Sequence, residues 1–207
     1  EKVYTFGNSN FATKIDGTLW AWGENEYGQL GVGHNKPVLT PTKIEEYGPW
    51  KLIHSNSTYN SGHTLALKDD GSLWVWGTGE RELGLGLGTK ETEVYTPTKV
   101  NDDTDWTDIG CGDGYSVAVK SDTTYWCWGG NRGGVFGDYE SRAYDLPTIE
   151  YPRWGGRIVQ IEASDEAVVA INTEGEVHIF APNMCGSTDS FVDDPSSIYL
   201  YSNYKGL

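Results

Sequence analysis

Histidine and cysteine are the side chains best suited to acid–base, nucleophilic or metal chemistry, and this sequence has few of either. The four histidines are scattered, and the three cysteines stand 16 and 58 residues apart, at Cys111, Cys127 and Cys185. A zinc site needs closely spaced pairs of these residues, and no such pair occurs. His63 and His178 fall at positions of an internal repeat, where a structural role is expected. The sequence therefore predicts no catalytic residue, no cofactor and no metal ion.

An acidic run at residues 101–108 is the strongest candidate for a cation site. Its first, third and fifth residues could supply calcium ligands, namely Asn101, Asp103 and Asp105. The sixth position of that template needs glycine and holds Trp106, and the twelfth needs glutamate and holds Gly112. This mismatch favours a solvated loop between structural units. Residues 84–88 are rich in glycine but lack the lysine of a phosphate-binding loop, which favours turns.

The elements that would position any site follow from a block that occurs four times. Its most visible position holds Trp22, Trp76, Trp128 and Phe180, at offsets of 54, 52 and 52 residues. Each copy has an apolar run that ends in lysine or asparagine, then a short turn, then a second apolar run. A period of about 50 residues is typical of units that bury their faces only against their neighbours.

The second copy shows the expected structure of one unit. Residues 50–53, 63–68, 72–76 and 96–100 have the composition of strands, and Asp70-Gly71 is a two-residue hairpin turn. The second and third strands are apolar on both faces, as in a propeller blade that is covered on both sides. We therefore expect an all-β protein, a β-propeller-type array of about four four-stranded blades. It would be a closed small propeller, or a partial one completed by the tail or by neighbours.

The expected domains follow the same period. Residues 1–181 should form the blades, with approximate bounds of 1–44, 45–100, 101–150 and 151–198. Residues 182–207 contain the divergent end of the last blade and an aromatic tail. The tail could supply a closing strand against residues 3–6, or it could dock on a neighbour.

Charge and hydropathy disfavour two classes of partner. The chain has 15 basic and 30 acidic residues, a formal net charge of −15, and a surface this acidic repels phosphate backbones. Nucleic-acid binding is therefore disfavoured. No apolar run approaches the roughly 20 residues that span a bilayer, so membrane insertion is not expected either.

Three linked motifs carry a family resemblance. They are Gly-His-Thr-Leu-Ala-Leu-Lys at 62–68, Leu-Trp-Val-Trp-Gly at 73–77 and Asn-Glu-Tyr-Gly-Gln-Leu-Gly at 25–31. Together they resemble the regulator of chromosome condensation repeat, and the likeness spans roughly residues 3–181. The resemblance implies a β-propeller used as a protein-binding platform. Members of that family differ in role, from exchange factors for a nuclear GTPase to surface proteins and parts of ligases. This chain differs from the best-known members in having four repeats instead of seven blades, and no basic arm.

The resulting hypothesis is a non-enzymatic protein–protein interaction propeller, a structural or surface subunit of a larger assembly or a homo-oligomer. A phage or bacterial particle is one such assembly, which favours an extracellular or virion surface. The alternatives are a glycan-binding surface module and, remotely, a GTPase nucleotide-exchange factor. Arginine and tyrosine are enriched at protein interfaces, so those in divergent loops and in the tail are the expected partner-binding residues. They are Arg81, Arg132, Tyr139, Arg142, Tyr144, Tyr199, Tyr201 and Tyr204.

Overall fold

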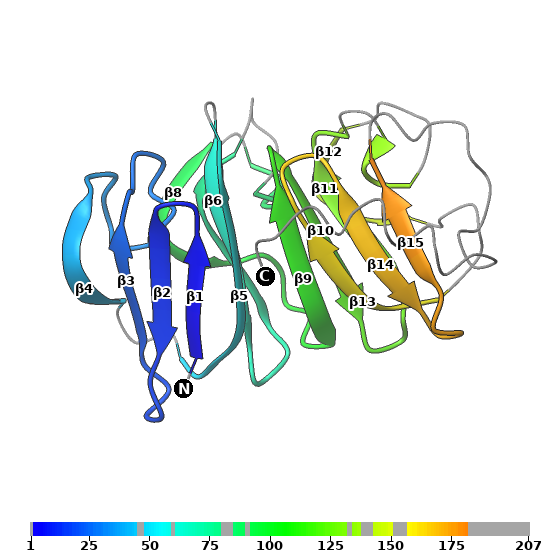
Figure 1. Cartoon of the computed structure of the whole chain (residues 1–207), viewed down its shortest axis with the longest axis horizontal. Helices are drawn as coiled ribbons and strands as arrows, with labels where there is room; N and C mark the ends of the chain where they lie inside the picture. Colours follow the sequence, from blue (N-terminus) through cyan, green and yellow to red (C-terminus); the bar gives the residue numbers. More distant parts are fainter. Residues whose placement is uncertain are drawn as a thin grey trace, which may run out of the picture.

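The chain folds into antiparallel β-sheets, each built from strands that are consecutive in the sequence (Figure 1). The computed structural model describes residues 2–44, 48–58, 61–79, 85–89, 92–131, 134–137, 143–150 and 157–181. The first sheet contains β1 (Lys2–Phe6), β2 (Ser9–Thr13), β3 (Leu19–Gly23) and β4 (Val38–Ile44). The second contains β5 (Trp50–Ser57), β6 (Gly62–Lys68), β7 (Leu73–Thr78) and β8 (Glu93–Lys99). The third contains β9 (Trp106–Gly112), β10 (Tyr115–Lys120), β11 (Tyr125–Gly129) and β12 (Tyr144–Glu150). The described part of the fourth contains β13 (Ile158–Ala163), β14 (Val168–Asn172) and β15 (Val177–Phe180).

A repeated turn joins the second and third strands of the first three sheets. In the second sheet Asp70 accepts hydrogen bonds from the main-chain N–H and the hydroxyl of Ser72, at 2.9 and 2.6 Å. The indole of Trp74 in turn donates to the Ser72 hydroxyl (2.9 Å), and the Lys68 ammonium lies 4.1 Å from the centroid of that ring. Gly71 allows the turn because its φ is +78°. The repeated lysine, aspartate and tryptophan positions thus form one local unit.

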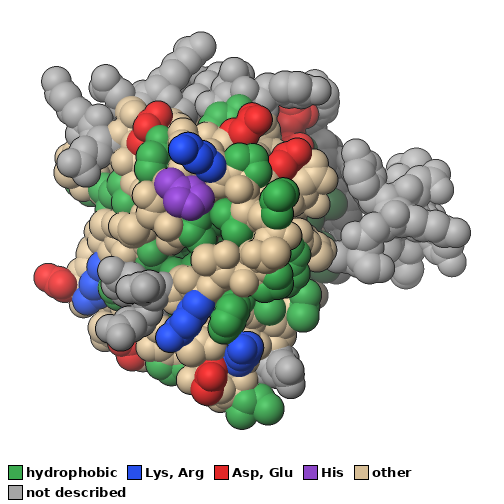
Figure 2. Space-filling model, turned by 90° about the vertical axis from the view of Figure 1, so that its left-hand side faces the viewer, with side chains coloured by type: hydrophobic (Ala, Val, Ile, Leu, Met, Phe, Trp, Pro, Cys, Tyr) green, Lys and Arg blue, Asp and Glu red, His purple; other side chains and the backbone are tan. Residues whose placement is uncertain are grey.

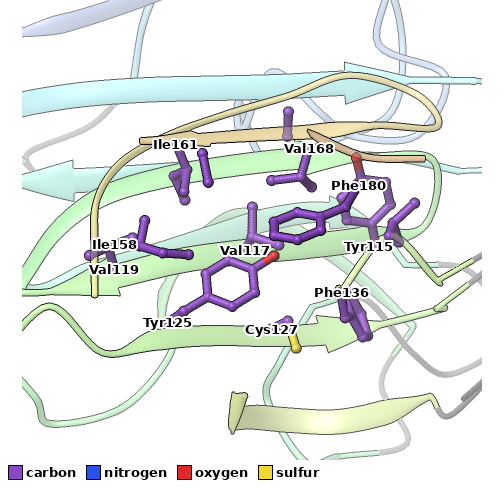
Figure 3. Packing of buried hydrophobic residues seen from close by; sticks show 13 residues of the cluster. Tyr115, Val117, Val119, Tyr125, Cys127, Phe136, Ile158, Ile161, Val168 and Phe180 are labelled. Carbon is purple, nitrogen blue, oxygen red and sulfur yellow. The ribbon is translucent and has the colours of Figure 1, made fainter. Parts of the chain in front are cut away.

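The sheets pack face to face in chain order. Elements of the first sheet contact the second, the second contacts the third, and the third contacts the fourth. In Figure 1 the first and fourth sheets lie towards opposite ends of the row. Between the third and fourth sheets, Tyr125 and Phe136 pack with Ile161 and Phe180 (Figure 3). The arrangement is the expected array of propeller blades, and the described residues form an open array.

How many faces of a sheet are buried depends on the position of that sheet in the array. Every residue of β6 from Gly62 to Leu67 is buried, so the second sheet is covered on both faces, as the sequence predicts for a blade. In β2 of the first sheet and β14 of the fourth, buried residues alternate with more exposed ones, so each of these sheets is covered on one face only. The expectation of two covered faces therefore fails at the two ends of the array, where no neighbouring sheet is present in the described structure.

The loop after the third strand of a sheet forms hydrogen bonds with the next sheet. The main-chain carbonyl of Gln29 accepts hydrogen bonds from the Trp76 indole and from the Thr64 hydroxyl, both at 2.7 Å. Gly31 lies flat against that indole, so a Cβ added there would lie 2.8 Å from the Trp76 nitrogen. Gly86 approaches Trp128 in the same way. We call this contact the inter-blade clamp.

Two further expectations concern the C-terminal tail and membrane-spanning segments. The tail at residues 182–207 lies outside the described residues, and so does its expected pairing with residues 3–6. Across the ranges that the structure describes, there is no helix of the length and hydrophobicity required to cross a membrane.

Candidate functional site

The first strands of the four sheets converge, and their side chains meet in a cluster that we call the hub cluster. It contains Phe6 of β1, His54 of β5, Cys111 of β9 and Glu162 of β13. The imidazole of His54 is central: Nδ1 lies 3.3 Å from the Cys111 sulfur and Nε2 lies 2.9 Å from a Glu162 carboxylate oxygen. The ring centroid of Phe6 is 5.2 Å from that of His54. Four sheets thus contribute one side chain each to one point.

Cysteine, histidine and glutamate in contact resemble a nucleophile with its base, but the geometry favours a structural role. The Cys111 side chain is fully buried, so no substrate can reach its sulfur. Nδ1 of His54 also accepts a hydrogen bond from the main-chain N–H of Cys111 (3.2 Å), which fixes the ring to β9. Because Nδ1 accepts this hydrogen bond, the imidazole carries its proton on Nε2, which donates to the Glu162 carboxylate.

A second set of polar contacts surrounds the hub cluster, and we call it the hub rim. It consists of Asn56, Thr58, Asp113, Glu162 and Asp165. Asn56 donates to the Asp165 carboxylate (2.7 Å) from a position 109 residues away in the sequence. The Thr58 hydroxyl donates to the Asp113 carboxylate (2.6 Å). These hydrogen bonds link the second sheet to the third and the fourth.

The carboxylates of the hub rim are open to solvent. The Glu162 side chain is 71% exposed, Asp165 is exposed and Asp113 is half-buried. The buried His54 contacts one of these carboxylates, that of Glu162, through Nε2. In the described part of the chain no group of three or more His, Cys, Asp or Glu residues is arranged to hold a metal ion. The rim can therefore offer hydrogen-bond acceptors and negative charge to a ligand from solution.

His63 lies just behind the rim and is fully buried, in agreement with the structural role expected for it. Its Nε2 is 2.8 Å from the Ser116 hydroxyl, which joins the second sheet to the third. Burial is the main reason why the pKa of His63 is lowered to about 4; His54 lowers it further, while Asp113 raises it. His63 is neutral at physiological pH.

The acidic run at residues 101–108 begins as a largely exposed loop between β8 and β9, as the sequence predicts, and this loop also pairs with a lysine. Asp103 and Asp105 form ion pairs with the Lys120 ammonium, at 2.7 and 3.1 Å. The same ammonium lies 4.6 Å from the centroid of the Trp106 ring. Two of the three positions considered as calcium ligands, Asp103 and Asp105, thus pair with a lysine of the third sheet.

One of the expected partner-binding residues can be placed in the structure. Tyr144 begins β12, where its ring stacks on Phe136 with a centroid distance of 6.0 Å and its hydroxyl donates to Glu150. The structure does not bring it to the hub rim. The other seven residues, Arg81, Arg132, Tyr139, Arg142, Tyr199, Tyr201 and Tyr204, lie outside the described residues. Of the cysteines, Cys111 and Cys127 are buried free thiols, and Cys185 is not described.

Sequence reasoning missed the hub cluster. His54, Cys111 and Glu162 are 57 and 51 residues apart, which is close to the repeat period. Each lies in the first strand of successive units, and first strands of propeller blades face a common axis. That combination of period and strand position was the available signal. It was weak because the three residue types differ and form no motif.

Comparison with known proteins gives a consistent family. The model of the regulator of chromosome condensation (RCC1) repeat matches residues 16–56 and 70–119. The human E3 ubiquitin-protein ligase HERC2 is 25% identical over 172 residues, which are 83% of this chain and 4% of the ligase. The secretion-regulating guanine nucleotide exchange factor of Bos taurus is 29% identical over 183 residues, 87% of this chain and 39% of that protein. The chain thus spans well under half the length of these curated relatives.

A solved structure shows the same fold. The crystal structure of Prp20p from Saccharomyces cerevisiae, described with its binding properties to Gsp1p and histones, aligns with a TM-score of 0.72 at 20% identity. The alignment covers 82% of this chain and 43% of that chain. At this identity the likeness concerns the fold alone.

Proposed function

Because this chain is built from repeats of the regulator of chromosome condensation type and folds as blades of an RCC1-type β-propeller, we propose that it is a non-enzymatic platform that binds other proteins. Its relatives and structural neighbours include protein-binding and exchange-factor propellers. Proteins with the same fold have different functions, so the proposed function is argued from the site. The hub rim is the site that we assign to this binding.

The observation that carries the proposal is the chemistry of the hub rim. The third and fourth sheets bring Asp113, Glu162 and Asp165 to one region, where hydrogen bonds from residues of the second unit hold them in place. Exposed carboxylates on a rigid framework, in a chain with a net charge of −15, favour a partner that presents lysine or arginine. We therefore infer a basic segment of another protein as the ligand of the hub rim.

The geometry of the hub cluster does not favour a catalytic role. Among the residues that the structure describes, the cluster that most resembles a nucleophile and its base has its sulfur fully buried. A glycan-binding surface would need exposed aromatic rings. The described tryptophans are all buried or half-buried, and the strongly exposed large hydrophobic residues of the described chain are all aliphatic. A role as a subunit of a larger assembly is compatible with the open array that the described residues form.

The test compares two charge-neutralised variants in binding a short lysine- and arginine-rich peptide. E162Q/D165N removes two rim carboxylates, and E26Q/E174Q removes two exposed carboxylates outside the hub rim. Two lost contacts should cost about 1 kcal/mol, roughly a fivefold weaker Kd, for the rim variant. Fluorescence anisotropy at low and high salt gives both values. Equal weakening by the two variants would mean that only net charge attracts the peptide, and the hub rim would lose its assigned role.

A further inference from the structure

The outermost strand of each of the first three sheets forms a bulge at the same place. In β8 the ladder with β7 skips residues 95–97, which lie opposite the single residue Trp76. The ladder skips residues 39–41 of β4 and residues 145–147 of β12 in the same way. Because β4, β8 and β12 end their sheets, their outer edges pair with no other described strand. These bulged segments are therefore the part of each outer strand that strand pairing holds least.

Each bulge contains a proline, and the residues around it differ between the sheets. The sequence is Thr-Pro-Thr-Lys at 96–99 and at 40–43, but Leu-Pro-Thr-Ile at 146–149. The proline recurs because an outer strand can lose a ladder donor without harm to the sheet. The bulge requires neither the first threonine nor the lysine, since the third sheet forms it without them. Threonine followed by proline, with lysine two positions after the proline, is the pattern that proline-directed protein kinases recognise in their substrates.

The two threonines of this pattern in β8 differ in the state of their hydroxyl groups. The Thr96 side chain is exposed, and within the described residues its hydroxyl makes no hydrogen bond. The Thr98 hydroxyl, by contrast, donates to the main-chain carbonyl of Thr96 (3.1 Å). The exposure of Thr96 does not come from an end of the array, because the second sheet packs between the first and the third. Thr96 is therefore the threonine whose hydroxyl is available for reaction.

The backbone around Thr96 has the conformation that a kinase binds. Residues 93–99 are extended in β8, and protein kinases bind the acceptor segment of a substrate as an extended chain. Pro97 has a φ fixed near about −65° and disfavours a helical conformation of the residue before it, which is Thr96. The segment can thus be bound with little rearrangement of the blade.

A phosphate on Thr96 would lie beside the loop of the first sheet that forms the inter-blade clamp. Gly33 of that loop donates to the Tyr95 carbonyl (2.8 Å), and a Cβ at Gly33 would lie 3.9 Å from the Thr96 methyl group. His34 and Lys36 follow in the same loop and are exposed. On the side of the first sheet, a histidine with a basic side chain next to it is visible at the surface (Figure 2). Basic groups near a phosphate stabilise it by charge-assisted hydrogen bonds.

We propose that Thr96 is a phosphorylation site for a proline-directed protein kinase, with Thr40 as the matching site in the first sheet. In the reaction the Thr96 Oγ attacks the γ-phosphorus of ATP, and the bond from that phosphorus to the β–γ bridging oxygen breaks. ADP leaves, and the hydroxyl proton passes to a carboxylate of the kinase. The product carries the phosphate at the outer edge of the blade, whereas the hub rim lies where the first strands converge.

Phosphorylation of the folded full chain by a purified cyclin-dependent kinase and ATP tests the proposal. Mass spectrometry of the digested protein should locate a phosphate on Thr96. T96A should lose this phosphate and P97A should lose most of it. T98A is the matched control and should be phosphorylated at Thr96 as fully as the wild type. Circular dichroism checks that each variant is folded.

A synthetic peptide of residues 91–104 shows whether the fold admits the kinase. The peptide and the folded chain should both be phosphorylated at Thr96. Absence of phosphate from Thr96 of the folded chain would overturn the proposal, and a phosphorylated peptide beside it would show that the blade hides the motif. Phosphate on Thr98 in place of Thr96, or equal yields from the wild type and P97A, would overturn it as well.

Discussion

At the scale of single residues, the buried histidine His63 links the packing of the hub to pH. Its pKa is lowered to about 4 chiefly by burial, whereas in the unfolded chain it has the ordinary value of about 6.5. Above pH 6.5 the ring is neutral in both states and contributes no pH dependence. As pH falls below 6.5 the unfolded state takes up a proton that the folded state does not, so stability falls until about pH 4.

This linkage predicts a difference between the wild type and H63Q, whose amide can still bond to Ser116. Between pH 7.5 and pH 5 the free energy of unfolding of the wild type should drop by about 2 kcal/mol relative to that of H63Q. Urea denaturation at several pH values measures both. Parallel pH profiles would mean that His63 takes up its proton at the same pH in the folded protein as in the unfolded chain.

The sequence predicted the structural role of a residue where the same local contact recurs in successive units. The lysine, aspartate and tryptophan positions of the turn, exemplified by Lys68, Asp70 and Trp74, repeat because the hydrogen bonds and cation–π contact are local. The hub cluster was not predictable, because His54, Cys111 and Glu162 meet only after three sheets have packed together.

At the scale of elements, the inter-blade clamp explains why glycines recur after the third strand of each sheet. Gly31 and Gly33 both have a positive φ, +72° and +86°, so a side chain costs backbone strain at either position. They differ in surroundings. A Cβ at Gly31 would lie 2.8 Å from the Trp76 indole nitrogen, whereas a Cβ at Gly33 would lie 3.9 Å from its nearest neighbour, a Thr96 methyl group.

The clamp therefore predicts that G31A destabilises the chain more than G33A. Backbone strain should cost both variants on the order of 1 kcal/mol, and displacement of the buried Trp76 should cost G31A about 1–3 kcal/mol more. Thermal and urea denaturation give the difference, and tryptophan fluorescence should change in G31A alone. Equal losses would mean that the loop does not hold the next sheet through this contact.

Strands were easier to predict than the loops that join them. Continuous apolar runs and the turn at Asp70-Gly71 indicated β6 and β7 nearly to the residue, because hairpin pairing depends on local chemistry. The partner-binding arginines and tyrosines were assigned to divergent loops, where no repeating contact constrains the chain. Only Tyr144 can be placed, and its stacking on Phe136 is a contact within the fold.

At the scale of the whole molecule, the repeat period predicted consecutive blades, and the structure has them. The period alone could not show whether the array closes, because the same apolar faces are required in a closed ring and in an open one. The exposure of Val3 and Val177 answers this for the described residues. The convergence of β1, β5, β9 and β13 on one hub is the feature on which both the protein-binding proposal and the site depend.

Cross-linking across the hub tests this convergence most directly. Asn56 and Asp165 are joined by a hydrogen bond of 2.7 Å although the second and fourth sheets are not consecutive. In a C185S background the remaining cysteines, Cys111 and Cys127, are buried, so N56C/D165C should be linked efficiently within one chain by a short bismaleimide. N56C/E174C is the control, because Glu174 lies at the opposite end of the fourth sheet. A linked peptide by mass spectrometry in the first variant alone is the predicted result; no link, or equal linking in both, would contradict the convergence of the blades on a common hub.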